Sequence, residues 1–522
     1  MNSAPQLAAF TPAPLSGGRL ALATLAVALA TFMNVLDSSI ANVAIPTISG
    51  NLGVSIDEGT WVITLFAAAN AISIPLTGWL TQRIGQIRLF VASILLFVLS
   101  SWLCGIAPNL TILLGARILQ GAVAGPLIPL SQAILLSSYP KEKSSHALAL
   151  WSMTATVGPI AGPALGGWIT DNYSWSWIFY INIPVGLFAA GATWAIYRSR
   201  ETPVTRRPID KVGLVALIGW VGALQIMLDK GKDLDWFDSP VIVALGIFTL
   251  VVFVFFIIWE ITDRNPVVDL RLFMGRNFLG GTVAISVAFA VFFANLVILP
   301  QWMQGYLNYR SVDAGMVTAP LGIFAVILAP VMAKIMPRSD SRVLATLAFL
   351  GFSGVFFMRS YYTTGVDTLT LVLPTLLQGI PTALFFVPLT EIILSGQPPE
   401  KIPAAAGLSN FVRVFAGAVG TSLTSTEWNN RTIVHHAQLV EQVNPGNPAF
   451  ASSIASIQNA LGGSTQQALA FIERSLNTQA TMLGLDDIFW LSAVIFIVIV
   501  PLIWITKPSK DGSSAAMGAG GH

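Results

Sequence analysis

The sequence predicts an all-α polytopic membrane protein with fourteen transmembrane helices. Of the 522 residues, 54% are hydrophobic and only 10% are charged, whereas soluble domains carry about 25% charged residues. Apolar segments recur along the chain at roughly 17–25 residues, the length that crosses a bilayer as a helix. A membrane β-barrel would need segments of about ten residues with alternating polarity, and the sequence shows none.

Fourteen segments have the length and composition of a span. In order, they cover residues 20–45, 58–80, 89–107, 110–136, 147–170, 175–197, 212–229, 239–262, 278–302, 314–336, 343–360, 369–395, 404–427 and 486–506. The first segment is too long for the core of a cleavable signal sequence, so we expect it to be retained. Residues 1–19, which carry one positive charge, are predicted to form a cytoplasmic N-terminal segment.

Lysine and arginine residues indicate the orientation, because they concentrate in the cytoplasmic loops of membrane proteins. They gather in residues 81–88, 137–146, 198–211, 263–277, 337–342, 396–403 and in the tail from Lys507. With these segments inside, an even number of spans places both termini in the cytoplasm. The longest outer loop is then 428–485, in which "FASSIASIQNALGG" and "QQALAFIERSLNTQ" are typical of short amphipathic helices.

An aspartate and an arginine lie deep inside the first and fourth predicted spans. At about 1.5 Å per residue, Asp37 lies about 25 Å from the cytoplasmic face and Arg117 roughly 9 Å from the opposite face. In a hydrocarbon core about 30 Å thick, the two side chains share one depth, so an ion pair is geometrically allowed. We interpret Asp37 as a proton carrier that alternates between a neutral state and an ionised state beside Arg117. The alternative is a static buried salt bridge.

The thirteenth span also carries a charge. Arg413 lies about 14 Å into that span, near mid-membrane, and needs an acceptor. Glu391, close to the inner end of the twelfth span, is one candidate partner, and helix-break carbonyls are another. Both residues therefore join the predicted proton-coupling set, with a snorkelling interfacial role as the alternative for Glu391.

Several amide side chains inside spans are candidates for lining a substrate cavity. They are Asn34, Asn70, Gln132, Asn295, Gln378 and Asn410. Hydrogen bonding between packed helices is the alternative role for each of them. As a group facing a cavity, they would suit amphipathic organic substrates.

Three short segments combine charge, glycine and proline in a way that suits helix junctions and close helix packing. The residues concerned are Gly78, Arg83, Gly85 and Arg88 in the loop "GWLTQRIGQIR", Gln120 and Gly121 after Arg117 in "ARILQG", and Gly158, Pro159, Gly162, Pro163, Gly166 and Gly167 in "TVGPIAGPALGGWI". Small residues four positions apart let helix backbones approach closely in a membrane. The prolines add kinks whose freed backbone groups must be satisfied locally.

These segments resemble motifs of the major facilitator superfamily, in its branch of fourteen-span drug:proton antiporters. The loop is similar to the family's cytoplasmic loop motif, "ARILQG" to its fourth-helix motif, "TVGPIAGPALGGWI" to the fifth-helix motif of exporters, and "LDSSIANVAIPTI" to the first-helix motif of this branch. One departure is Gln82, where the loop motif usually carries an aspartate. "NYSWSWIFYINIPVG", "LQIMLDKGKDLDWF" and "LSGQPPEKIPAAAGLSNFVR" are similar to the inner-membrane pumps of tripartite drug exporters.

The resemblance implies the major facilitator fold. The expected parts are a six-helix half over 20–197, two inserted helices over 212–262, a second six-helix half over 278–506 that includes the loop 428–485, and a cytoplasmic tail over 507–522. Each half is expected to hold inverted repeats, with a substrate cavity at the interface of the halves near the midplane.

The resemblance also implies secondary active efflux in a bacterial inner membrane. Protons would move inward while hydrophobic or amphipathic toxic compounds move outward, and no cofactor is expected because the proton gradient drives transport. A periplasmic adaptor protein and an outer-membrane channel are the implied partners, with the long outer loop on the adaptor's side. The alternative is a proton-coupled transporter of one metabolite, siderophore or fatty acid in the same fold.

Other classes of function lack their characteristic residues. The single cysteine, Cys104, excludes a disulfide framework within the chain. His435 and His436 have no carboxylate or cysteine at metal-ligand spacing, so no metal site is predicted. The glycines of the fifth span lack the phosphate-loop pattern. No catalytic constellation is present, so the chain is not expected to be an enzyme, and nucleic acid is not an expected partner.

Overall fold

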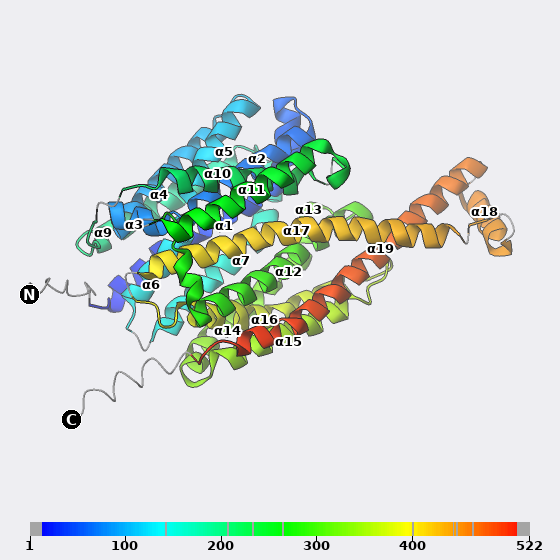
Figure 1. Cartoon of the computed structure of the whole chain (residues 1–522). Helices are drawn as coiled ribbons and strands as arrows, with labels where there is room; N and C mark the ends of the chain where they lie inside the picture. Colours follow the sequence, from blue (N-terminus) through cyan, green and yellow to red (C-terminus); the bar gives the residue numbers. More distant parts are fainter. Residues whose placement is uncertain are drawn as a thin grey trace, which may run out of the picture.

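The structure is a computed structural model that describes residues 13–140, 143–205, 208–231, 234–263, 266–398, 401–441, 443–444, 447–461 and 464–508. In this part of the chain every regular element is a helix (Figure 1). The first half contains α1 (Gly17–Leu52), α2 (Ile56–Ser73), α3 (Thr77–Ile84), α4 (Gln86–Gly105), α5 (Leu110–Ala124), α6 (Leu127–Ser138), α7 (Ser144–Asn172), α8 (Trp177–Tyr180) and α9 (Asn182–Tyr197). A hairpin of α10 (Lys211–Lys230) and α11 (Pro240–Thr262) follows.

The second half continues the same pattern. It contains α12 (Arg276–Tyr306), α13 (Ser311–Thr318), α14 (Leu321–Ile335), α15 (Ser341–Arg359), α16 (Thr368–Leu394), α17 (Ile402–Val440), α18 (Pro448–Leu461), α19 (Thr465–Val498) and α20 (Val500–Trp504). Short 3-10 helices of the described chain are η2 (Trp236–Asp238), η3 (Leu270–Met274) and η4 (Met336–Arg338). We call the end at which α1 begins and α20 ends the basal end.

Each of the fourteen predicted spans falls on one helix or on two consecutive helices. Within the described residues, eleven helices are long and apolar enough to cross a membrane, or up to twelve if the bent pair α2–α3 is one span. The two other predicted spans lie on α7 and on α13 with α14. The helical fold and its many apolar helices therefore confirm the predicted fold class.

Prolines mark three of the places where predicted spans divide into two helices. Pro75 lies between α2 and α3, which are bent by 61°, Pro126 lies between α5 and α6, and Pro320 lies between α13 and α14. Proline lacks the N–H that would continue the helical ladder, and its ring clashes with the preceding turn. The sequence thus dictates where these helices change direction.

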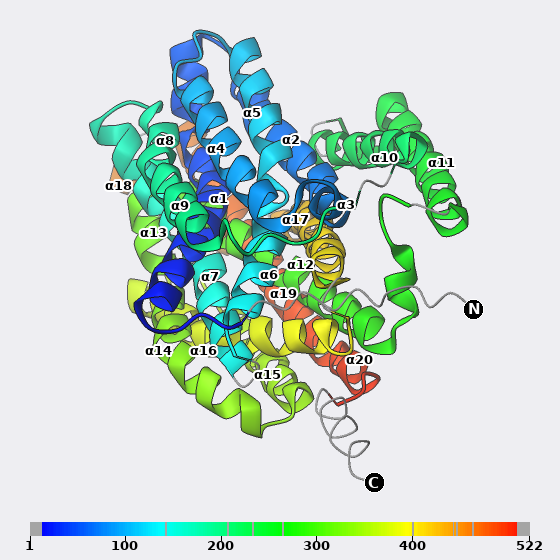
Figure 2. The same ribbon diagram turned by 90° about the vertical axis from the view of Figure 1, so that its left-hand side faces the viewer.

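The two halves meet along a seam formed by α7 and α17. Figure 2 looks along the helices from the basal end and shows α4, α5 and α9 on one side of the bundle and α14, α15 and α20 on the other. Across the seam, α7 packs against α13, α14 and α16, while α17 packs against α2, α3 and α6. Each half therefore sends one long helix into contact with its neighbour.

The hairpin α10–α11 stands outside this bundle (Figure 2). Its helix α10 contacts both α2 of the first half and α17 of the second. Trp220 on α10 makes the contact with α17, with its ring centroid 5.9 Å from that of Phe411 and 5.5 Å from that of Phe415. The inserted hairpin therefore covers one side of the seam.

The second half is built around stacked aromatic rings. Phe352 of α15 lies 4.9 Å from Phe496 of α19 between ring centroids, and Phe385 of α16 also packs against Phe352, at 5.7 Å. All three rings are buried. Without a hydrophobic driving force between helices in lipid, such close van der Waals contact is what holds a membrane bundle together.

Two helices continue far beyond the bundle and form a stalk, residues 428–485 (Figure 1). With 39 residues in α17 and 34 in α19, these helices are about 50–60 Å long, against about 30 Å for the bilayer core. Trp428 donates to the carbonyl of Thr481 at 3.0 Å, and His436 pairs with Glu473 at 3.0 Å. The prediction of short separate helices here is confirmed for α18 and wrong for "QQALAFIERSLNTQ", which is part of α19.

Candidate functional site

The first half contains a fully buried polar centre around Asp37. One carboxylate oxygen, Oδ2, accepts a hydrogen bond from Nη1 of Arg117 at 2.6 Å. The other, Oδ1, accepts from Gln120 at 3.0 Å and from Asn182 at 2.8 Å. Both amides also donate to Oγ of Ser101, at 2.8 and 3.2 Å. Residues from α1, α4, α5 and α9 thus converge on one carboxylate.

The guanidinium of Arg117 is held by more than its carboxylate. Its Nε donates to the carbonyl of Val62 at 3.0 Å, and Nη1 also donates to Oε1 of Gln120 at 2.7 Å. Its carbon lies 4.1 Å from the ring centroid of Phe66, within cation–π range. Nη2 is buried and has no hydrogen-bond partner among the described residues. Among the described residues, the Nη2 group of Arg117 is therefore still able to donate a hydrogen bond.

This buried ion pair is not expected to increase the folding stability of the protein much. Moving two charges out of water costs several kcal/mol per ion, and buried pairs are often no better than apolar replacements. Removing one partner is much worse, because it leaves a buried charge uncompensated. The centre is consequently an arrangement in which the charge of Asp37 is tolerated only while its donors stay in place.

The glycines predicted in the fifth span lie against α1, next to Asp37. A Cβ added at any of three of them would overlap the α1 helix. The close pairs are Gly158 with Val35, Gly162 with Ser39, and Gly166 with Ile40. Gly167 is buried in the same helix, and the side chains of Pro159 and Pro163 lie outside the described residues. The glycine motif thus brings α7, a seam helix, directly onto the helix that carries the carboxylate.

The loop motif lies at the basal end of the seam. A Cβ at Gly78 would stand 2.7 Å from Cβ of Ala404 at the start of α17, so this glycine lets the two halves touch. In the fourth span, Gly121 similarly lets α5 approach α2, because its Cβ would meet Ala69 at 3.0 Å. Arg83 lies over the ring of Trp79, with 5.3 Å between the guanidinium carbon and the ring centroid.

The carboxylate of Glu201, which was not among the predicted site residues, forms hydrogen bonds with this loop. Its two oxygens accept from the backbone N–H groups of Ile87 at 3.0 Å and Arg88 at 2.9 Å, at the start of α4. Oγ1 of Thr202 accepts from the N–H of Gln86 at 3.0 Å. The first N–H groups of a helix lack internal partners and favour negative charge, so Glu201 satisfies this terminus.

The backbone of the loop fits this contact. Gly85 has φ of 97°, a left-handed conformation that glycine adopts without strain. Its missing side chain leaves room for the carboxyl group of Glu201, which a Cβ would overlap. Gln82, where the family motif usually carries an aspartate, accepts a backbone hydrogen bond from Thr205 at 2.7 Å. The segment after α9 thus supplies the negative charge that the loop itself lacks.

The predicted pairing of Arg413 with Glu391 does not form among the described residues. Glu391 accepts from Oγ of Ser341 at 3.1 Å, near the start of α15. It lies three residues from the basal end of α16, whereas Arg413 lies eleven residues into α17. The two side chains therefore differ in depth by about 12 Å.

The six amides predicted to line a cavity have different surroundings. Gln378 accepts from Arg359, Asn295 donates to Oγ of Ser492 at 2.9 Å, and Asn410 donates to the carbonyl of Ala406 in its own helix. Asn34 and Asn70 each have a buried Oδ1 with no hydrogen-bond partner, and Gln132 is buried in α6. Gln378 and Asn295 thus bond to a neighbouring helix, as does Asn34, whose Nδ2 donates to the carbonyl of Ala124 at 3.4 Å. Among the described residues, Oδ1 of Asn295 also has no partner.

A second buried polar centre lies in the second half, around Arg359, which was not among the predicted site residues. Arg359 is 2% exposed and donates to Oγ1 of Thr375 at 3.0 Å and to Oε1 of Gln378 at 2.7 Å. A constant offset of 258 residues relates the positions of the first centre to positions in the second half. It relates Asp37 to Asn295, Ser101 to Arg359, Arg117 to Thr375, and Gln120–Gly121 to Gln378–Gly379.

The same offset relates the helix starts. It carries Asn109, the N-cap of α5, onto Asp367, the N-cap of α16, and both side chains accept from a backbone N–H of the following turn. The halves are therefore repeats of one unit, with an asparagine in the second half where the first has its aspartate. This repeat is the sequence signal that could have found Arg359.

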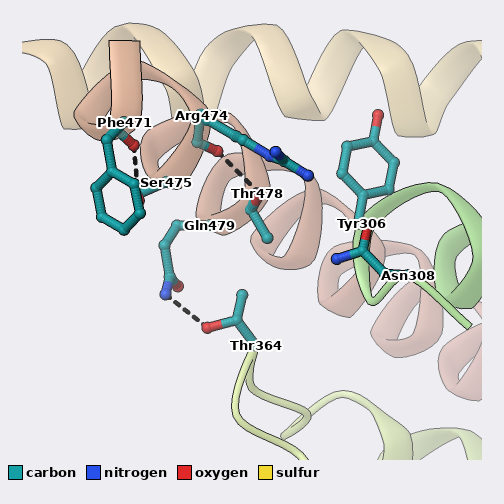
Figure 3. A pocket seen from close by; sticks show the side chains of 8 residues that line it. All are labelled: Tyr306, Asn308, Thr364, Phe471, Arg474, Ser475, Thr478 and Gln479. Atoms are coloured by element: carbon teal, nitrogen blue, oxygen red, sulfur yellow. Dashed lines mark hydrogen bonds between the residues drawn. The ribbon is translucent and has the colours of Figure 1, made fainter. Parts of the chain in front are cut away.

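A polar pocket of about 460 Å³ lies at the foot of the stalk, away from the Asp37 centre. Figure 3 shows Arg474, Thr478 and Gln479 of α19 facing Tyr306, at the end of α12, and Thr364, after α15. Gln479 donates to Oγ1 of Thr364 at 2.6 Å. The stalk is thus anchored on the second half. No group of three or more metal-binding side chains occurs in the part of the chain that the structure describes.

Known proteins resemble the chain over almost its full length. Residues 27–421 match the Major Facilitator Superfamily. The multidrug export protein EmrB of Escherichia coli is 50% identical over 507 residues, covering 97% of this chain and 99% of that protein. The fatty acid resistance protein FarB of Neisseria gonorrhoeae is 46% identical, covering 98% and 99% of the two chains.

A solved transporter structure shares the fold. The proton:xylose symporter XylE superposes with a TM-score of 0.58 at 12% identity, covering 93% of this chain and 95% of that one. At that identity the similarity speaks for the fold alone. The match to the family over residues 27–421, with the 50% identity to EmrB along 97% of the chain, shows that the chain belongs to the major facilitator superfamily.

Proposed function

We propose that the chain is a proton-coupled multidrug efflux transporter of the bacterial inner membrane, with both termini in the cytoplasm. The observation that carries the proposal is the fully buried Asp37–Arg117 pair, in a chain that is 50% identical to a multidrug export protein along its whole length. An ionisable pair inside a membrane bundle is expected to have a functional role, because its burial is costly. Basic residues of the basal loops support the orientation.

The packing of α1 suggests how a proton on Asp37 affects the seam. When Arg117 and the amides hold the carboxylate, its charge is compensated, and when they move away, protonation removes a charge that would otherwise be stranded. The glycines of α7 couple α1 to the seam, because any rocking of α7 against α13, α14 and α16 displaces the helix that carries Asp37. Proton binding and alternating access would then be one event.

The proton gradient can supply the energy without a cofactor. Each elementary charge that crosses the membrane contributes about 2.3 kcal/mol per 100 mV of membrane potential. A pH gradient adds to this value. One or two protons per cycle would therefore suffice to move a hydrophobic compound outward against a concentration gradient.

Inverted membrane vesicles provide the direct test of proton-driven efflux. With an inside-acid pH gradient, vesicles that contain the chain should accumulate a fluorescent hydrophobic dye, and an uncoupler should release it. Vesicles without the chain serve as the control for passive partition. Accumulation that persists without any gradient, or that occurs only in right-side-out vesicles, would contradict the proposal.

The stalk is the surface that we propose for a periplasmic adaptor protein, which would connect the chain to an outer-membrane channel. Large apolar side chains are exposed along it, among them Ile433 at 59%, Val434 at 51% and Phe471 at 51%. The stalk extends past the bundle and is fastened to the second half by Gln479. The alternative is a stalk that packs only on this chain and covers the outer mouth.

Replacing Ile433 and Val434 with glutamate should weaken adaptor binding by at least about tenfold, because charges would have to be buried in an apolar contact. The measurement is co-purification of a co-expressed periplasmic adaptor protein, with Gln438→Glu on the same exposed helix as the control. Complex formation equal to that of the unchanged protein would rule out this face of the stalk.

The alternative of a more restricted substrate range has one specific observation in its favour. The relative FarB, whose name records resistance to fatty acids, is 46% identical to this chain. Amphipathic acids are therefore a substrate class that deserves a direct comparison with neutral compounds of the same length.

A further inference from the structure

Arg413 lies in a cage of aromatic rings at the seam between the halves. Its guanidinium carbon is 5.2 Å from the ring centroid of Phe289, 5.5 Å from that of Phe386 and 5.9 Å from that of Trp151. The rings belong to α12, α16 and α7, so both halves contribute. Gly417, one turn further along α17, makes room for Phe289, because a Cβ there would stand 2.9 Å from that ring.

No hydrogen bond or ion pair joins Arg413 to another described residue, and its buried Nε has no acceptor. Arg413 is only 6% exposed. The other two buried arginines of the described chain each have one buried nitrogen without a partner, Nη2 of Arg117 and Nε of Arg359. Unlike Arg413, however, they donate to polar side chains, Arg117 to Asp37 and Arg359 to Thr375 and Gln378. An unpaired charge in such a place is costly, and cation–π contacts recover only part of that cost.

The fold itself does not require an arginine here. The offset that relates the two halves carries Arg413 onto Ala155 of α7, the corresponding seam helix, and relates the first residues of both helices, Ser144 and Ile402. The corresponding helix of the first half thus has an uncharged residue at this position. A charged side chain kept at the seam of one half only is best explained by something that binds there.

We propose that Arg413 binds the anionic group of an amphipathic organic acid, whose apolar part lies against the rings of Trp151, Phe289 and Phe386. The proposal rests on the proposed efflux function and names a substrate class for it. A carboxylate matches the guanidinium fork with two parallel hydrogen bonds, which are stronger than bonds between neutral groups. Aromatic walls supply the apolar contact that such ligand sites require.

An anion fits this site better than the other ligand types. A cationic compound would be repelled by the unpaired guanidinium, and no described carboxylate lies within ion-pair distance to offset that repulsion. A neutral compound would leave the arginine as it is now, buried and uncompensated. Only an anion removes the unfavourable burial when it binds, so the arginine should discriminate by charge.

The test compares decanoate with decanamide, which have the same length and shape but differ in charge. Equilibrium binding of each radiolabelled compound is measured on the purified chain in lipid nanodiscs at neutral pH. The unchanged protein should bind decanoate at least about tenfold more tightly than decanamide, and Arg413→Gln should reduce that preference about tenfold. Arg413→Lys, which keeps the charge without the planar fork, should give an intermediate preference.

Two further variants keep the outcome decisive. Arg413→Met removes the unpaired charge with an apolar side chain of similar length, so it should fold even if the glutamine variant does not. Arg310→Gln removes an exposed arginine that pairs with Asp313 and should leave the preference unchanged. A preference that survives in the glutamine or methionine variant, or that is absent from the unchanged protein, would overturn the proposal. Because no gradient is applied, either result leaves the vesicle test of efflux to stand separately.

Discussion

Asp37→Asn is expected to reduce proton-driven export by at least about 100-fold, the magnitude typical of losing a proton-transfer group. The carboxylate accepts from Arg117, Gln120 and Asn182, and all four residues are buried. An asparagine has the same shape but cannot bind or release a proton. Transport that depends on a protonation cycle should therefore stop, even if substrate still binds.

The same substitution should also destabilise the protein, which has to be separated from the loss of transport. An amide N–H2 facing Nη1 of Arg117 leaves the guanidinium buried without a counter-charge, which costs about 3–5 kcal/mol. The double variant Asp37→Asn with Arg117→Gln removes both charges and should recover most of that stability. It should remain inactive in proton-driven export.

Proton release from the purified protein on substrate binding gives the most direct measurement. The unchanged protein should release protons into weakly buffered solution, and both Asp37 variants should release none. Asp171→Asn, which changes an exposed carboxylate at the end of α7, is the matched control and should behave like the unchanged protein. Normal proton release from Asp37→Asn would assign the coupling to another group.

The pairing of Asp37 with Arg117 could be predicted because hydropathy fixes the depth of a residue along its span. The same reasoning failed for Arg413 and Glu391, since proximity also depends on which helices touch. The structure places Glu391 beside Ser341 and Arg413 among aromatic rings. Depth alone cannot distinguish a partner from a residue on the far side of a neighbouring helix.

Helix ends were the least predictable part of the fold. Hydropathy reports where a span leaves the hydrocarbon, and α17 and α19 continue as helices well past that point. Arg359, the last residue of α15, was not predicted as a site residue, and the structure shows it buried against Thr375 and Gln378 of the next helix. Glu201 was missed because its partners, the first N–H groups of α4, carry no sequence signal.

The glycine motif could be located from spacing, but its neighbour could not. The structure shows that the neighbour is α1 on both sides of Asp37, with Val35 and Ser39 directly under Gly158 and Gly162. A motif typical of exporters thus acts on the helix that carries the predicted proton site. At Gly162 a larger side chain would therefore meet both the side chain of Ser39 and the backbone of Ile40.

Gly162→Leu is accordingly expected to reduce transport about 100-fold, the loss that a misplacement of about 1 Å can cause, while the protein still inserts into the membrane. Its Cβ would lie 2.9 Å from Cβ of Ser39, closer than real Cβ contacts come, and 3.1 Å from the backbone nitrogen of Ile40, which is tighter than most of them. Helix α7 must then move off α1, and the donors around Asp37 lose their alignment. The measurement is gradient-driven dye uptake in inverted vesicles, normalised to the amount of inserted protein.

A matched control and a rescue identify the contact as the cause. Gly191→Leu on α9 adds the same side chain where a Cβ would meet nothing within 4 Å, so it should transport normally. Gly162→Ala should cause a smaller loss of transport. Adding Ser39→Gly to Gly162→Ala should restore transport, because the side chain gained on α7 is offset by the side chain removed from α1. Full transport by Gly162→Leu, or failure of the rescue with both proteins correctly inserted, would show that the close approach of α7 and α1 is not what couples Asp37 to the seam.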